Sequence, residues 1–171
     1  MSSFQNVIAA AKAIHDELAA ELGPPEEGLQ STTQTVILMS LVRNTRGYVV
    51  RIANQINGAY ENGWYDACAV MIRRMIETLI IEAFEHHKIA HKIQSSVGDF
   101  FFLRDLIEAT LKEGSWNLSR NVKQALPRLK EVGDKSAHSR RFVAQRGDIQ
   151  PLLTDIRVVV QELLFIADLK K

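Results

Sequence analysis

GWYDACAVMIRRMIETLIIEAF, residues 63–84, predicts one long and largely buried helix. It contains no proline and no internal glycine, and apolar residues cover most of its circumference, which is typical of a helix at the centre of a core. Asp66, Arg73 and Glu77 share one face because they are seven and four positions apart, with Arg74 beside them. We expect Arg73 and Glu77 to form a buried ion pair, so that Glu77→Ala destabilises the fold by about 3 kcal/mol.

The composition is that of a globular domain with an ordinary core. The 171 residues are 46% hydrophobic and 24% charged, with a formal net charge of +1. No global basic field therefore attracts nucleic acid, and such a partner needs a local patch. The single cysteine, Cys68, excludes an internal disulfide and fits a reducing cytoplasm. The sequence has no apolar run of about 18 residues and no secretory signal, so we expect a cytoplasmic protein without membrane contact.

Turn-forming residues and helical periodicity divide the chain into three parts. Residues 1–22 are an alanine-rich helical extension, residues 23–30 a linker with glycines and prolines, and residues 31–171 a helical domain. The extension either packs on its own subunit or docks on a second one. Within the domain, one long helix is expected over residues 32–61, with a bend near Gly47.

The segments on either side of the central helix predict its packing. Asn62-Gly63 is expected to form a left-handed cap, which turns the central helix back along the helix before it. After the central helix, another is expected from Phe100 to Glu113, in which Phe102 faces the core.

The last two long helices have their own start signals. Ser119 is expected to cap the first, which Pro127 either kinks or restarts, and Asp148 or Gln150 begins the second. No alternating pattern predicts a strand. The fold class is therefore all-α, an up-down bundle of four to five long helices with an extra N-terminal helix. Its amphipathic helices carry more apolar surface than one bundle covers, so we expect a homodimer.

The segment from Gly133 to Arg141 holds the densest group of reactive side chains. His138 is a candidate catalytic acid or base at neutral pH. Lys135, Arg140 and Arg141 are candidate phosphate ligands. The alternative interpretation is structural, a helix end whose basic side chains are solvated.

This segment is expected to lie in a turn beside the polar face of the central helix. Asp66, Arg73 and Glu77 need polar neighbours there, so His138 should form one pocket with Arg73 or Arg74. The predicted site has His138 as the catalytic candidate and, for binding, Arg73, Arg74, Glu77, Asp134, Lys135, Arg140 and Arg141.

A metal site is a weaker interpretation of the histidines that follow the central helix. His87 and His91 are four positions apart, which suits one metal ion if the helix continues. No Asp, Glu or Cys completes a recognisable ligand set with them. We therefore expect a solvated helix end, with no metal and no other cofactor.

Two motifs give the chain a resemblance to a known family. The central helix contains Arg-Arg-x-x-Glu at residues 73–77, and LKEVGDKSAHSRRF contains Gly-Asp-x-x-Ala-His at residues 133–138. Over about residues 46–169 the chain resembles a bacterial domain family of unknown function, grouped with the HEPN superfamily of "higher eukaryotes and prokaryotes nucleotide-binding" helical domains. The resemblance implies a bundle of four or five helices, commonly dimeric, that acts in defence or stress systems.

Many members of that superfamily are metal-independent ribonucleases, in which four to six residues separate an arginine from a histidine and two chains pool their motifs. His138 matches the histidine, but Gly133, Val132 and Glu131 occupy the positions of the arginine. We therefore expect a binding or regulatory module for RNA or a nucleotide rather than an enzyme. The alternatives are a structural domain that binds a protein partner and, less favoured, an endoribonuclease that uses His138.

Overall fold

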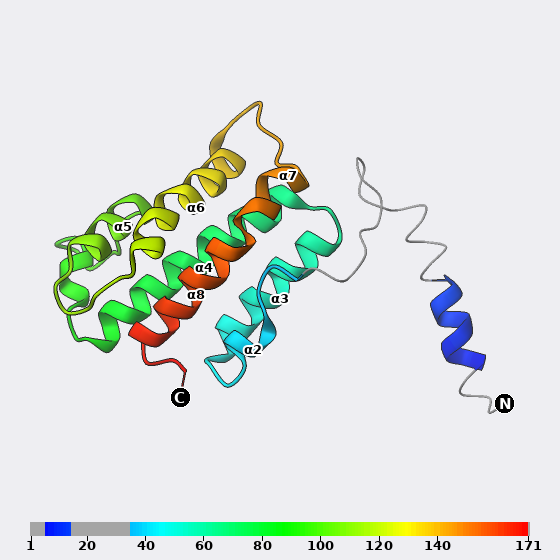
Figure 1. The fold of residues 1–171 in the computed structure, drawn as a ribbon, viewed down its shortest axis with the longest axis horizontal. Coiled ribbons are helices and arrows are strands. Elements are labelled where there is room, and N and C mark those ends of the chain that lie inside the picture. Colours follow the sequence, from blue (N-terminus) through cyan, green and yellow to red (C-terminus); the bar gives the residue numbers. More distant parts are fainter. Residues whose placement is uncertain (1–5, 15–34, 171) are drawn as a thin grey trace.

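Helices make up the regular structure of the described residues, 6–14 and 35–170, in the computed structural model (Figure 1). In these two ranges the β-type pairing is limited to one isolated bridge between Gln94 and Phe100, so the chain is all-α, as predicted. Residues 6–14 form a helix with every residue exposed, and the predicted linker at 23–30 lies outside the described residues. None of the described helices is both long and apolar enough to cross a lipid bilayer.

The central helix is α4, Tyr65–His86, as its composition predicts. It packs against α3, α5, α6 and α8, and it runs beside α8 through the middle of the bundle (Figure 1). Gly63 has a φ of 72°, which is the left-handed conformation predicted for the turn before α4. The other elements are α2 Met39–Val42, α3 Gly47–Glu61, η1 Ala90–Ile93, α5 Leu103–Lys112, α6 Arg120–His138, α7 Arg146–Ile149, η2 Gln150–Leu152 and α8 Leu153–Ile166.

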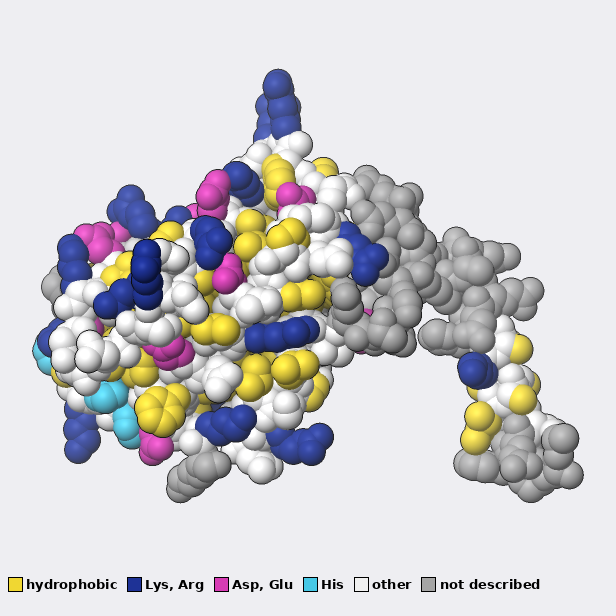
Figure 2. Space-filling model, viewed as in Figure 1, with side chains coloured by type: hydrophobic (Ala, Val, Ile, Leu, Met, Phe, Trp, Pro, Cys, Tyr) yellow, Lys and Arg dark blue, Asp and Glu magenta, His cyan; other side chains and the backbone are white. Residues whose placement is uncertain are grey.

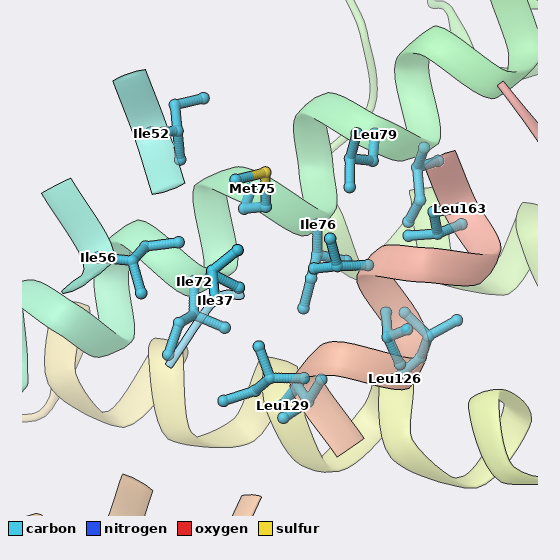
Figure 3. Close-up of a cluster of buried hydrophobic side chains, with 14 of the residues drawn as sticks. Ile37, Ile52, Ile56, Ile72, Met75, Ile76, Leu79, Leu126, Leu129 and Leu163 are labelled. Atoms are coloured by element: carbon cyan, nitrogen blue, oxygen red, sulfur yellow. The ribbon is translucent and has the colours of Figure 1, made fainter. Parts of the chain in front are cut away.

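Side chains of α4 fill the centre of the core (Figure 3). Each buried aliphatic side chain of this size stabilises the fold by about 1.5–3 kcal/mol. The α4 helix therefore joins the other helices into one core. Among the buried residues are Ile72, Met75, Ile76 and Leu79 of α4, Ile56 of α3, Leu126 and Leu129 of α6, and Leu163 of α8.

The prediction of a single long helix over residues 32–61 is wrong for residues 35–61, the part of this range that the structure describes. The chain is helical at α2 and again at α3, with a break between them. Asn44 interrupts the helix because its backbone is left-handed, with a φ of 67°. Thr45 Oγ1 also donates a hydrogen bond to Val42 O at 2.6 Å across the break.

Contacts from distant residues stabilise this break. Asn57 of α3 holds the backbone of Ile37 in a bend before α2, because its Oδ1 accepts from the amide of Ile37 at 2.9 Å and its Nδ2 donates to the carbonyl at 2.9 Å. At the start of α3, Arg46 Nε lies 3.3 Å from Glu82 Oε2, and the Tyr48 hydroxyl donates to Glu82 Oε1. Hydrophobic periodicity carries no sign of either contact.

The α5 helix begins at Leu103, which is later than predicted. A 2.9 Å hydrogen bond from Phe101 N to Ile93 O and the neighbouring β-bridge at Phe100 hold the preceding residues extended. As a result Phe102, predicted to face the core, is 81% exposed.

The α6 helix begins at the predicted cap and ends later than predicted. Ser119 Oγ accepts a hydrogen bond from Val122 N at 3.3 Å. Pro127 lies inside α6 without ending it. The helix then continues through Gly133 to His138, so the prediction of a turn over that segment is wrong.

Candidate functional site

Gly133 allows α6 to cross close to α4. A Cβ atom at this position would lie 2.8 Å from Arg73 Cβ and 3.2 Å from the carbonyl oxygen of Ala69. Contacts this short are not tolerated between packed atoms, so a larger residue would force the two helices apart. The glycine therefore serves close helix packing and not the turn predicted for it.

The close crossing brings charged side chains of α4 and α6 into contact. Arg73 Nε donates to Asp134 Oδ1 at 3.0 Å, and Lys130 Nζ binds Asp134 Oδ2 from one turn earlier in α6. The predicted pair between Arg73 and Glu77 is present but longer, at 3.7 Å. Asp134 is thus the main partner of Arg73.

Asp134 is held as a carboxylate by its two cationic partners. Burial on its own would raise the pKa of Asp134, but the hydrogen bonds from Lys130 and Arg73 outweigh it, and the pKa lies below its usual value. The side chains of Arg73, Lys130 and Asp134 are 23%, 24% and 30% exposed, so they are only partly shielded from solvent. The cluster is a partly solvent-exposed network of ion pairs and not the buried pair of Arg73 and Glu77 expected from the sequence.

Beside this network lies an open groove of about 310 Å³ between α4, α5 and α6. Three cations and two carboxylates line it, so the groove carries a net positive charge even when its histidine is neutral. An exposed phenyl ring stands in its wall. The lining residues are Arg73, Phe102, Arg104, Asp105, Lys130, Asp134 and His138.

Part of the predicted site therefore comes together in this groove. His138, at the last turn of α6, is exposed and lines the groove with Arg73 and Asp134. The expected juxtaposition of imidazole, guanidinium and carboxylate is present in the geometry. Glu77 reaches the groove only through its contact with Arg73.

Other predicted residues lie away from the groove. Arg74 is exposed on α4 and does not line the groove. Lys135 binds Glu131 at 2.8 Å along α6. Arg140 and Arg141 are exposed in the loop between α6 and α7, where basic side chains stand at the tip of the molecule in Figure 2.

Asp66 also has a different neighbour from the one expected. Its Oδ1 accepts a hydrogen bond from Ala144 N at 3.0 Å. This contact fastens the loop after α6 to the first turn of α4. Asp66 therefore has a structural role. The polar face predicted for α4 is divided, because Asp66 binds the loop after α6 whereas Arg73 binds Asp134 of α6.

Sequence reasoning missed four residues of the groove: Phe102, Arg104, Asp105 and Lys130. The spacing of Lys130 and Asp134, four positions apart on one helix, was a usable signal for a pair. Nothing in the sequence indicated that Phe102 is exposed, because its position among three consecutive phenylalanines also fits the buried face of a helix.

A larger hollow, of about 480 Å³, lies on the outer face of α8. Phe165, which is 79% exposed, lines it together with Val158, Gln161, Glu162 and Lys170. This hollow has more volume than the groove but far less cationic chemistry. The groove is therefore the more cationic of the two depressions, whereas polar and apolar side chains both line the hollow.

His87, considered above as a metal ligand, and the single cysteine both have structural roles. His87 Nε2 lies 3.1 Å from Ile166 O, and its ring packs edge-on against Trp116 at 5.0 Å. Cys68 is fully buried in α4, and burial raises the pKa of its thiol to about 12, so it remains protonated at neutral pH. Among residues 6–14 and 35–170, no cluster of three or more His, Cys, Asp and Glu is placed to hold a metal ion.

No protein-family model matches this chain, and neither a curated protein nor a solved structure matches it at significant similarity. The groove's own side chains therefore carry the functional assignment. They offer cationic donors, an imidazole and an exposed phenyl ring within one surface depression.

Proposed function

We propose that this chain is a HEPN-like, dimeric binding or regulatory module of a bacterial defence or stress system, and that RNA or a nucleotide binds in the groove between α4, α5 and α6. The observation that carries the proposal is the convergence of Arg73, Arg104, Lys130 and His138, from three helices, on one groove of about 310 Å³. Guanidinium and ammonium groups are the usual protein ligands of phosphate oxygens.

Arg73, Lys130 and Arg104 already have carboxylate partners, which affects how a phosphate would bind. Arg73 and Lys130 share Asp134, while Arg104 Nε lies 2.9 Å from Asp105 Oδ1. A phosphate would use the remaining N–H groups of these side chains, so we expect modest affinity that falls with salt concentration.

A structural role is the second candidate function, and the ion network itself favours it. Arg73, Lys130 and Asp134 satisfy one another without a ligand. A purely structural domain with a protein partner would need the same contacts between α4 and α6. A substitution in the groove that abolishes ligand binding without lowering stability would support the binding function over the structural one.

An endoribonuclease is the third candidate. His138 is exposed in the groove, so it is accessible as an acid or base, and Arg73 lines the same groove. The arginine of the ribonuclease motif is missing from its sequence position, which is why we place binding first.

The test is binding of a fluorescein-labelled 20-nucleotide RNA of mixed sequence, followed by anisotropy at low salt with a chelator present. Lys130→Ala should weaken binding several-fold and reduce the salt slope by about 1, because one phosphate contact is lost. Lys135→Ala is the matched control, since Lys135 lies on the same helix outside the groove, and it should bind as the wild type does.

Equal binding by Lys130→Ala and the wild type, or no binding by the wild type, would contradict a nucleic-acid function for this groove. Gel electrophoresis of the same RNA after incubation with the protein shows whether the RNA is cleaved, and so distinguishes an endoribonuclease from a binding module. Cleavage that disappears in His138→Ala would establish the endoribonuclease instead.

A further inference from the structure

Phe102 presents its ring to solvent from a rigid backbone. The ring is 81% exposed, although the next residue, Leu103, is fully buried. Before Phe102, Phe101 N donates to Ile93 O at 2.9 Å, and after it the carbonyl of Phe102 accepts from Asp105 N at 2.9 Å. The main chain on both sides of Phe102 is therefore held by hydrogen bonds at the start of α5.

Folding alone does not explain an exposed phenyl ring at this position. A phenylalanine stabilises a fold through burial, and a ring this exposed gains almost none of that stabilisation. Its neighbour Phe101, in contrast, packs against the core. Phe102 also lines the groove that holds Arg104, Lys130 and His138.

We propose that Phe102 is a stacking platform for one unpaired base of single-stranded RNA, with Arg104, Lys130 and His138 beside the phosphates that flank this base. An exposed aromatic ring among basic side chains is the combination by which proteins bind single strands without reading their sequence. This inference rests on the proposed function and names the ligand class of the same groove.

The size of the groove sets how much of the strand it holds. A volume of about 310 Å³ is at the lower end of the range for ligand pockets, so it accommodates about one nucleotide. The rest of the strand crosses the surface. Bases in a duplex are already stacked on one another and cannot reach the ring, so a duplex gains only the phosphate contacts.

The experiment separates stacking from charge by comparing two probes with the same phosphates. The first is a fluorescein-labelled 12-nucleotide oligoadenylate, and the second is an abasic oligomer of equal length. Wild-type protein should bind oligoadenylate at least five-fold more tightly than the abasic strand, and Phe102→Ala should remove this difference. Phe102→Trp should keep it, because an aromatic face is retained.

Trp64→Ala is the matched control, because Trp64 is an exposed aromatic residue, at 57%, in the turn before α4 and outside the groove. It should bind both probes as the wild type does. Thermal unfolding of Phe102→Ala should match the wild type, since the ring is exposed, which excludes a folding defect.

Equal wild-type affinity for the two probes would overturn the stacking role while leaving a phosphate-binding groove intact. Unchanged preference in Phe102→Ala would overturn it as well. If the wild type binds neither probe at low salt, the proposed function and this inference both fail. Tight, Phe102-dependent binding of a phosphorylated peptide, without RNA binding, would instead assign the groove to a protein partner.

Discussion

Arg73 Nε and Asp134 Oδ1 lie 3.0 Å apart and join helices α4 and α6 across 61 positions of sequence. Glu77, the partner that helical spacing predicts for Arg73, is farther away at 3.7 Å. The charge on the central helix is therefore balanced from a neighbouring helix, and the pair fixes the position of α6 relative to α4.

Asp134→Ala should destabilise the protein more than Glu77→Ala. Removing Asp134 leaves both Arg73 and Lys130 without their carboxylate, and we expect a loss of about 1–2 kcal/mol because these side chains are partly shielded. Glu77→Ala should cost about 0.5 kcal/mol, well below the value expected for a buried pair. Urea unfolding of the two variants measures the difference, and a larger loss for Glu77→Ala would reverse this order.

Gly133 and Gly58 should respond to substitution in opposite directions. A side chain at Gly133 meets Arg73 and Ala69, so Gly133→Val should destabilise the fold by about 2–3 kcal/mol. Nothing lies within 4 Å of a Cβ at Gly58 in α3, so Gly58→Ala should stabilise it by about 0.5–1 kcal/mol. Thermal unfolding with calorimetry checks both, and tolerance of valine at Gly133 would refute the close crossing.

Glu113 should make stability depend on pH. The hydrogen bond from Lys92 Nζ, 2.8 Å from Oε2, is the main cause that lowers the pKa of Glu113 from 4.5 to about 2. A depressed pKa in the folded state stabilises the protein above about pH 4.5, and this contribution is lost as the pH falls toward 2.

We therefore expect Glu113→Gln to cost about 0.5–1 kcal/mol at pH 7, because solvent screens the contact with Lys92. The difference in unfolding free energy between this variant and the wild type should become smaller as the pH falls from 4.5 toward 2. Urea unfolding at a series of pH values measures this difference. A difference in unfolding free energy that stays constant over that pH range would show that the contact with Lys92 does not lower the pKa of Glu113.

The hollow on α8 should contribute to self-association. Phe165 is 79% exposed at its edge, and a large apolar ring in a surface hollow is typical of a contact surface. We expect a dimer in sedimentation at micromolar concentration and a monomer for Phe165→Asp, which places a charge in the contact. A wild type that sediments only as a monomer would remove the dimer from the proposed function.

Features that depend on local composition were predictable from the sequence. The apolar circumference of residues 63–84 gave the central helix, Gly63 its left-handed turn, and Ser119 the cap of α6. Each is decided within a few residues of sequence. The all-α fold class follows from the same kind of local pattern.

The remaining features depend on partners that lie far apart in sequence. Asn57 holds the backbone of Ile37 in a bend, and this contact opposes the helix that periodicity predicts. The groove was predictable as a meeting of Arg73 and His138, since both had to find polar neighbours. Phe102 was not, because its exposure depends on the main-chain contacts that precede α5.

Cys68 makes this protein convenient for site-directed labelling. It is the only cysteine of the chain, it is fully buried, and its thiol stays protonated at neutral pH. Thiol reagents should therefore react selectively with a cysteine introduced at an exposed position, without replacement of the native residue. A fluorophore or spin label attached in this way would report on the surface of the bundle free of background from its core.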